Sequence, residues 1–232
     1  MNPFLKAVTS SVGKKYIMAV TGLGLVGFVI THLVGNFNLL ALVPGPINQY
    51  TQSLANYGWL LEVAEVGLAL MFLVHIWASV SLSLESKRAR PVGYAVERTK
   101  GGPSKSTLSS RNMGLLGAFL AAFLVFHILQ FKLGAGVQQG YVDTSNPDRP
   151  IRDMYRLVAE TFQNPWYVAL YCACMLVLGF HLRHGIWSAF QSMGVTHQGF
   201  SSHVYKASLV LAILLAGGFF IIPIYMYVGG TP

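Results

Sequence analysis

Four histidines occupy four different apolar stretches of the sequence. They are His32, His75, His127 and His181, and His184 follows His181 by one helical turn. An ionisable side chain at membrane depth is costly, so such a residue indicates a functional site. A single one is also explained by a neutral imidazole that hydrogen-bonds to another helix. Four of them together favour a shared function.

Two imidazoles that face each other across a helical bundle supply the axial ligands of a six-coordinate haem iron. Heights follow from sequence offsets, because an α-helix rises about 1.5 Å per residue. Counted from the positively charged ends of their stretches, His32 and His127 lie roughly 24 to 26 Å deep, and His75 and His181 about 15 to 18 Å. The four therefore sort into two pairs, which predict two stacked haems.

Glycines lie one turn after two of these histidines, at Gly35 and Gly185. They leave room for a porphyrin, and small residues also allow membrane helices to pack closely. The two uses are compatible, so both remain open.

The elements that carry these histidines are predicted to be membrane helices. The 232 residues are 53% hydrophobic and only 10% charged, with a mean hydropathy of +0.52. Spanning a bilayer takes roughly 20 mainly apolar residues. We therefore expect an all-α integral membrane bundle that forms a single domain over residues 1–232. Its five helices are predicted at about 15–42, 59–84, 112–131, 165–190 and 204–228, with loops at Pro44–Pro46, Lys87–Pro91 and Asn146–Pro150.

The formal charge of +8 is divided unequally between the two ends of these helices. One end sums to +10 and the other to −2. The positive-inside rule then predicts a cytoplasmic N-terminus and an external C-terminus. Basic loops also account for the positive excess without nucleic acid. The cations of the predicted cytoplasmic side are Lys6, Lys14, Lys15, Lys87, Arg88, Arg90, Arg98, Lys100, Lys105, Arg111, Arg183 and Lys206.

Other metal and redox sites are disfavoured by residue spacing. A cytochrome b of the bc type takes all four ligands from two helices, and no two stretches here offer that. A c-type haem needs Cys-x-x-Cys-His, which the sequence lacks. A zinc or di-iron site needs acids or further histidines clustered at one height. The two cysteines, Cys172 and Cys174, are interpreted as small apolar residues of the fourth stretch.

Several short motifs accompany the four histidines. They are Ser11-Val12-Gly13-Lys14-Lys15, Thr21-Gly22, His32-Leu33-Val34-Gly35-Asn36, His181-x-x-x-Gly185 and Trp187-Ser188-Ala189-Phe190-Gln191. With one histidine in each of the first four of five helices, the chain resembles the single-subunit di-haem cytochrome b anchor of bacterial succinate:quinone oxidoreductases. The resemblance covers nearly the whole chain.

The resemblance implies roles for the histidines. His75 and His181 would hold the haem nearer the cytoplasm, and His32 and His127 the distal haem. His181 is preferred to His184 because the ligand in relatives precedes the glycine by four residues. His184, Arg183, Lys15 and Arg111 are candidates for contact with haem propionates, since a cation near the interface can offset a carboxylate. An interfacial cation that snorkels or anchors its helix is the alternative for the last three.

The resemblance also implies quinone sites. Ser11 with Lys15 is similar to a Ser-x-x-x-Arg element near the inner quinone, with Lys in place of Arg. Lysine can still hydrogen-bond to a quinone carbonyl, but it lacks the planar fork of arginine. Glu62 or Glu65 would correspond to an acid that some menaquinol-oxidising relatives need. One branch has a further acid beside the fourth-helix ligand, which this sequence lacks.

The implied partners are an iron–sulfur subunit and a flavoprotein subunit, docked on the cytoplasmic face of the bacterial inner membrane. The cofactors would be two haems b, with menaquinone or ubiquinone as the electron acceptor. The chain would not oxidise succinate itself, but would pass electrons from the iron–sulfur subunit to quinone. The alternatives are the cytochrome b anchor of a hydrogenase or nitrate reductase, or a haem-free transporter that uses histidines to relay protons.

Overall fold

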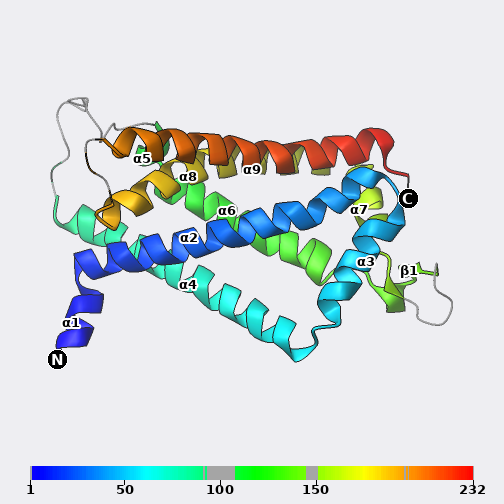
Figure 1. The fold of residues 1–232 in the computed structure, drawn as a ribbon, viewed down its shortest axis with the longest axis horizontal. Coiled ribbons are helices and arrows are strands. Elements are labelled where there is room, and N and C mark those ends of the chain that lie inside the picture. Colours follow the sequence, from blue (N-terminus) through cyan, green and yellow to red (C-terminus); the bar gives the residue numbers. More distant parts are fainter. Residues whose placement is uncertain are drawn as a thin grey trace. The chain divides into compact units, whose positions relative to one another are not determined.

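The structure, a computed structural model, describes residues 2–90, 92, 108–144, 151–195, 197 and 199–231. Within these residues, five helices are long and apolar enough to cross a membrane. They are α2 (Ser11–Asn36), α4 (Trp59–Arg88), α6 (Met113–His127), α8 (Pro165–Ser192) and α9 (Ser201–Gly229), shown in Figure 1. The third span includes the helical residues after α6 and runs over Met113–Lys132. The prediction of an all-α fold with five spanning helices is confirmed.

Two of the five helices change their geometry at the end. A 3₁₀-helix, η1 (Phe37–Ala41), follows α2, and a π-helix, η2 (Ile128–Lys132), follows α6. The π-turn begins directly after His127. Such turns are rare and occur frequently at functional sites.

The Cα trace divides into two compact units. The first unit comprises Met1–Gly27, Val66–Gly117 and Phe180–Ala212, and the second comprises Phe28–Glu65, Ala118–Gly179 and Ile213–Pro232. Each of the five long helices contributes one segment to each unit. The first unit contains His75 and His181, and the second contains His32 and His127.

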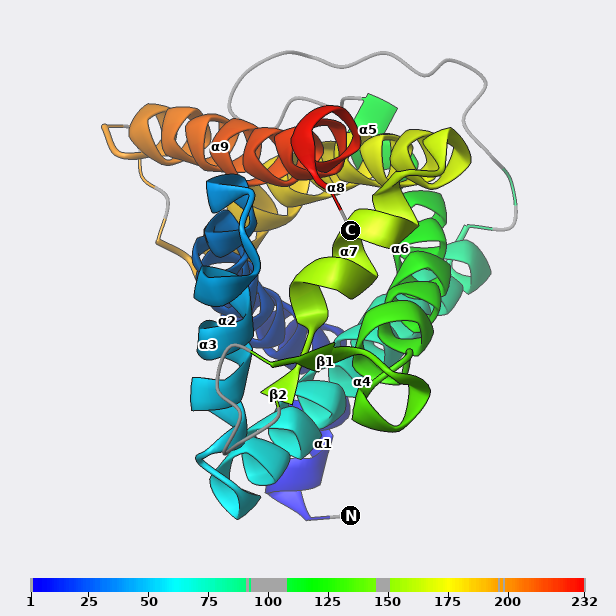
Figure 2. The ribbon, with the colours of Figure 1, turned by 90° about the vertical axis from the view of Figure 1, so that its right-hand side faces the viewer.

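Short elements accompany the long helices. The first unit has α1 (Pro3–Thr9) and α5 (Leu108–Arg111). The second has α3 (Pro44–Ala55), η3 (Val137–Gln139), α7 (Met154–Phe162) and a two-stranded ribbon. In the ribbon, β1 (Val142–Asp143) pairs antiparallel with β2 (Ile151–Arg152), with Val142 opposite Arg152. Figure 2 shows α7 beside the ribbon and α3, and α3 contacts both α7 and β2.

The predicted loop at Pro44–Pro46 is wrong, because these residues form the first turn of α3. The first N–H groups of a helix have no intrahelical acceptor, so proline is tolerated there and its fixed φ favours a helix start. The extended backbone of Val43 precedes the turn. Of the other two predicted loops, Asn146–Pro150 and Pro91 lie outside the described residues, as do Glu97, Arg98, Lys100 and Lys105.

A buried asparagine joins the short elements of the second unit. Asn48 of α3 is fully buried, and its Nδ2 donates to Asp143 Oδ2 at 2.8 Å and to Asp153 Oδ1 at 2.9 Å. Its Oδ1 accepts from the backbone N–H of Tyr155 at 3.0 Å. Asp153 also caps α7 by accepting from the N–H of Arg156. One side chain therefore ties α3 to the ribbon and to α7.

Candidate functional site

In the second unit, His32 of α2 and His127 of α6 lie beside each other. Their ring centroids are 5.9 Å apart, and the ring planes cross at 87°. His32 stacks on Phe28 with a centroid distance of 5.3 Å, and the ring of Phe219 lies 5.7 Å away. Both imidazoles are half-buried. The structure thus brings together the two histidines that were predicted to be the deeper pair.

A tyrosine of α8 contacts the second member of this pair. The Tyr171 hydroxyl lies 3.3 Å from Nδ1 of His127 and donates to Oε1 of Gln130 at 3.0 Å. Nε2 of Gln130 in turn donates to Oγ1 of Thr161 at 3.5 Å. His127 is therefore held by a chain of polar groups from α8, η2 and α7. Among the residues that the structure describes, His32 has no such chain. Nδ2 of Asn36 donates to its backbone carbonyl at 2.8 Å and lies 3.4 to 3.5 Å from its ring nitrogens.

In the first unit, His75 of α4 is held by the Thr21-Gly22 motif of α2. Thr21 Oγ1 lies 3.2 Å from Nδ1 of His75 and donates its own proton to the carbonyl of Ile17 at 2.7 Å. A Cβ atom built on Gly22 would lie 3.1 Å from Cε1 of the same imidazole. The absence of a side chain on Gly22 therefore leaves room for the His75 ring, and the hydroxyl of Thr21 contacts Nδ1 of that ring.

His181 of α8 is the other histidine of the first unit that was predicted as a ligand. It lies in the same unit as His75. A Cβ atom on Gly117 of α6 would lie 3.6 Å from its Cε1, an ordinary contact. Its Nδ1 is buried and has no hydrogen-bond partner among the described residues. Leaving a buried polar atom unpaired costs free energy, a cost that a bound ligand can remove.

The pair of His32 and His127 fits the ligand requirement of a haem. A metal–imidazole bond is about 2 Å long, so two imidazoles on opposite sides of one iron have centroids roughly 6 Å apart. The His32–His127 separation of 5.9 Å matches this value. His75 and His181 lie in one unit, and each has a glycine of a neighbouring helix beside Cε1 of its ring. In the described part of the chain, no three His, Cys, Asp or Glu side chains cluster to hold a metal ion.

The glycines predicted to make room differ in their surroundings. A Cβ atom on Gly35 would lie 2.5 Å from the hydroxyl of Tyr50, so this glycine permits close packing against α3. A Cβ atom on Gly185 would meet nothing within 4 Å. Only Gly185 therefore has open space beside it.

The predicted propionate contacts are in different environments. Arg183 donates from Nη2 to the Tyr205 hydroxyl at 2.6 Å and lies over that ring, so α9 holds it. His184 is half-buried and makes no hydrogen bond to a described residue. Lys15 is exposed on α2, and Arg111 is exposed at the end of α5.

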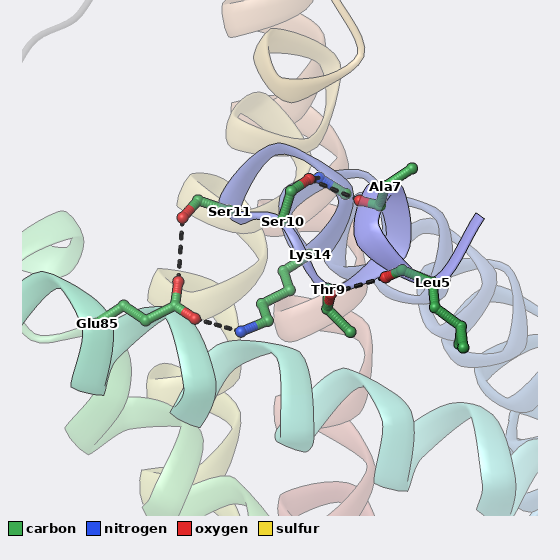
Figure 3. Close-up of polar contacts among 8 residues, drawn as sticks. Leu5, Ala7, Thr9, Ser10, Ser11, Lys14 and Glu85 are labelled. Carbon is green, nitrogen blue, oxygen red and sulfur yellow. Dashed lines mark hydrogen bonds and ion pairs between the residues drawn. The ribbon is translucent and has the colours of Figure 1, made fainter. Parts of the chain in front are cut away.

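Ser11, which was predicted with Lys15 as part of a quinone site, contacts a carboxylate of α4 (Figure 3). Ser11 Oγ donates to Oε2 of Glu85 at 3.1 Å, and Nζ of Lys14 binds the other carboxylate oxygen. Lys14 is buried, with 8% of its surface exposed, and its ammonium lies 5.9 Å from the centroid of Trp77. The polar group near the start of α2 is therefore Ser11, Lys14 and Glu85.

The two acids at the start of α4 also differ. Glu65 forms an ion pair with Lys132 at the end of η2. Glu62 is exposed and makes no ion pair with a described residue. Of the two, only Glu65 is fixed in place by a contact.

A cluster of charged and polar groups in the second unit lies outside the five long helices. Glu160 of α7 accepts hydrogen bonds from the Tyr141 hydroxyl and from Nε of Arg156. These two bonds, that of Tyr141 first, hold the pKa of Glu160 below its usual value, and the same carboxylate raises the pKa of Tyr141. Arg152 donates to the carbonyls of Ala135 and Gly134, and its burial lowers its pKa.

Sequence reasoning missed the residues that hold the histidines. Tyr171 and Gln130 were not singled out, although Gln130 is a polar residue one turn after His127 and so shares its helix face. Thr21 was quoted only as part of a motif. Lys14 was quoted in a motif and counted as a charge, and Glu85 entered only through the charge sum. A search for polar residues within one turn of each intramembrane histidine finds Gln130, whereas Thr21 and Tyr171 come from other helices.

The fold indicates a multi-pass membrane protein with one predicted ligand histidine on each of α2, α4, α6 and α8. Comparison with family models, with curated proteins and with solved structures found no match to the chain. What the protein does therefore rests on its own residues.

Proposed function

We propose that the chain is the membrane-anchoring cytochrome b subunit of a bacterial succinate:quinone oxidoreductase, with two haems b. The observation that carries this proposal is the arrangement of four intramembrane histidines as two pairs. Each unit contains one pair, and each pair comes from two different helices. Paired imidazoles are the ligand set of a six-coordinate haem, and a helical bundle is where such sites are built.

The histidines of this proposal have specific roles. His32 and His127 hold the distal haem, and His75 and His181 hold the haem nearer the cytoplasm. When bound, the haems supply one-electron redox chemistry, while the protein binds and orients them. Thr21 and Tyr171 orient the imidazoles of His75 and His127. Arg183 and His184 lie close in sequence to the ligand His181 and are candidates for haem propionate contacts.

The quinone and partner sites follow from the resemblance and the charges. Ser11, with Lys14 and Glu85 instead of Lys15, is the candidate group for the inner quinone, because it combines hydroxyl, ammonium and carboxylate. Glu65 and Glu62 are the candidates for a quinone on the other side. The iron–sulfur and flavoprotein subunits dock beside the basic connection after α4 on the cytoplasmic face of the inner membrane. The N-terminus then faces the cytoplasm, as the positive-inside rule favours.

The proposal is tested by counting haems in the purified complex. We expect two haems per chain and a reduced b-type absorption band. Single changes of His32, His75, His127 or His181 to alanine are expected to leave one haem. His203→Ala is the matched control, because His203 is an exposed histidine near the start of α9, and it should retain both haems. Two haems in every variant would contradict the ligand assignment.

The same preparation separates the alternatives. A co-purified subunit with covalent flavin supports succinate:quinone oxidoreductase, whereas nickel or molybdenum indicates the anchor of a hydrogenase or nitrate reductase. A chain that is folded but binds no haem supports a proton-coupled transporter, in which the paired histidines relay protons.

A further inference from the structure

Tyr171 is the most enclosed polar side chain beside a histidine of either pair. It is 6% exposed, and its ring lies 5.1 Å from Phe123, 5.1 Å from Phe162 and 5.9 Å from Phe131, measured between centroids. These aromatic contacts hold the ring from several sides. The position of its hydroxyl is therefore fixed relative to His127.

The direction of the hydrogen bond between Tyr171 and His127 follows from counting protons. A tyrosine hydroxyl has one proton, and that of Tyr171 is donated to Oε1 of Gln130 at 3.0 Å. Gln130 uses its amide nitrogen toward Thr161, which leaves its oxygen free to accept. The hydroxyl oxygen can then only accept from Nδ1 of His127, 3.3 Å away. Nδ1 carries the proton, and Nε2 carries the lone pair.

We infer that Tyr171, with Gln130 behind it, is a positioning residue that fixes the tautomer of His127 and raises the basicity of the nitrogen that binds iron. The inference rests on the proposed function, because it needs a haem on His127. A metal-bound histidine that donates its other N–H to an acceptor becomes a stronger ligand. A stronger ligand stabilises the oxidised iron and lowers its midpoint potential.

The first test removes the hydroxyl and retains the ring. Tyr171→Phe keeps the aromatic contacts, so both haems should remain bound. The midpoint potential of one haem is expected to rise, because His127 loses its acceptor, while the potential of the other haem is unchanged. Tyr167→Phe is the matched control, since Tyr167 lies one turn earlier on α8 and its hydroxyl makes no hydrogen bond to a described residue.

The second test changes Gln130, at the far end of the hydrogen-bond relay that runs from Gln130 through Tyr171 to His127. Gln130→Glu places a stronger acceptor behind Tyr171, so the midpoint potential of the same haem is expected to fall. A carboxylate also lowers a potential by its charge alone, so the double variant Tyr171→Phe with Gln130→Glu is needed. If the relay operates, the fall caused by the glutamate is smaller in the Tyr171→Phe background, a non-additive result.

The outcomes are distinct. Two bound haems with unchanged potentials in Tyr171→Phe overturn the inference and leave the proposed function intact. An equal fall for Gln130→Glu in both backgrounds overturns the relay, because only charge then acts. Absence of haem from the wild-type complex overturns the proposed function and the inference with it. A rise for Tyr171→Phe, together with a fall for Gln130→Glu that is smaller in the Tyr171→Phe background, supports the relay, since neither charge alone nor a merely structural role predicts both results.

Discussion

His127 in the second unit and His181 in the first each share a unit with another histidine that was predicted as a ligand, but their Nδ1 atoms differ in environment. Nδ1 of His127 contacts Tyr171, which is linked through Gln130 to Thr161. Nδ1 of His181 is buried without a hydrogen-bond partner among the described residues. In the first unit the partner histidine, His75, is the one fixed, by Thr21 of α2. Each unit therefore fixes one imidazole firmly through a hydroxyl.

This difference shows how one ligand set can give two unequal sites. The hydrogen-bond partner of a ligating histidine tunes the metal that it binds. A tyrosine linked to an amide and a threonine linked to a backbone carbonyl are unequal acceptors. We therefore expect two haems of different potential, with the difference arising from residues that do not touch the metal.

The units also differ in how their polar groups are enclosed. Asn48 in the second unit is fully buried among two carboxylates and a backbone N–H. In the first unit, the ion pair between Lys14 and Glu85 has a glutamate side chain that is 39% exposed. Buried hydrogen bonds are costly to break, whereas exposed ion pairs contribute little. The second unit is thus the one whose stability depends on a polar network.

The largest effect on stability is expected from Asn48→Ala. The change leaves Asp143 and Asp153 without their shared donor, and it leaves the N–H of Tyr155 unpaired. Removing one partner from buried hydrogen bonds to charged groups should lower the free energy of unfolding by about 3 kcal/mol. Chemical unfolding in detergent measures this loss, and hydrogen exchange should show it in α3 and α7.

Gln49→Ala is the control for this prediction. Gln49 is the neighbouring residue on α3, and its side chain is exposed. Its truncation should change the free energy of unfolding by less than about 0.5 kcal/mol. Equal losses for the two variants would show that the asparagine network does not distinguish the second unit.

The second-largest effect is expected from a larger side chain at Gly22, beside the imidazole of His75. In Gly22→Ala the new Cβ atom would lie 3.1 Å from Cε1 of His75, so the imidazole must move by a few tenths of an ångström. Because Thr21 also holds this ring, we expect roughly tenfold weaker retention of the haem bound by His75 and His181, a loss typical of disturbed support around a ligand. Haem titration of the purified protein measures the retention.

Gly117→Ala is the matched change on the other side of the pair. Its Cβ atom would lie 3.6 Å from Cε1 of His181, an ordinary contact. Alanine also favours a helix over glycine by about 1 kcal/mol. Full haem content and slightly higher stability are therefore expected. Equal haem loss in both variants would show that the two glycines do not differ as their distances indicate.

Much of the fold could be predicted from the sequence. The five spanning helices follow from apolar length alone, since a bilayer requires about 20 such residues. Both ends of the predicted 165–190 helix lie within two residues of the ends of α8. The short elements between the helices were missed because their composition resembles that of loops. In the sequence, Pro44 and Pro46 indicate a turn. In the structure, Val43 is extended and a helix begins directly after it, at Pro44.

The candidate site could also be predicted only in part from the sequence. Helical rise placed His32 level with His127, and the structure brings these two residues together. The hydrogen-bond partners of these histidines could not be predicted, because Tyr171 comes from another helix. The helical rise gives the height of a residue in the membrane, but not the direction in which its side chain points. Lys15 was selected by its resemblance to a Ser-x-x-x-Arg element, whereas the lysine that contacts Glu85 beside Ser11 is Lys14.

The smallest effect is expected from Glu160, at the exposed rim of the second unit. Its pKa is held below the usual 4.5 by the hydrogen bond from Tyr141 and then by that from Arg156. A carboxylate with a lowered folded-state pKa stabilises the fold above its unfolded-state pKa, and that stabilisation is lost as the pH falls through the folded-state value. Glu160→Gln should therefore lower Tm by about 1–2 °C at pH 7, as expected for an exposed ion pair of about 0.5 kcal/mol, and by less at pH 3. Glu62→Gln, at an exposed acid without a described ion pair, should leave Tm unchanged at both pH values. A Glu160 effect as large as that of Asn48→Ala would mean that exposed contacts stabilise the second unit as strongly as its buried network.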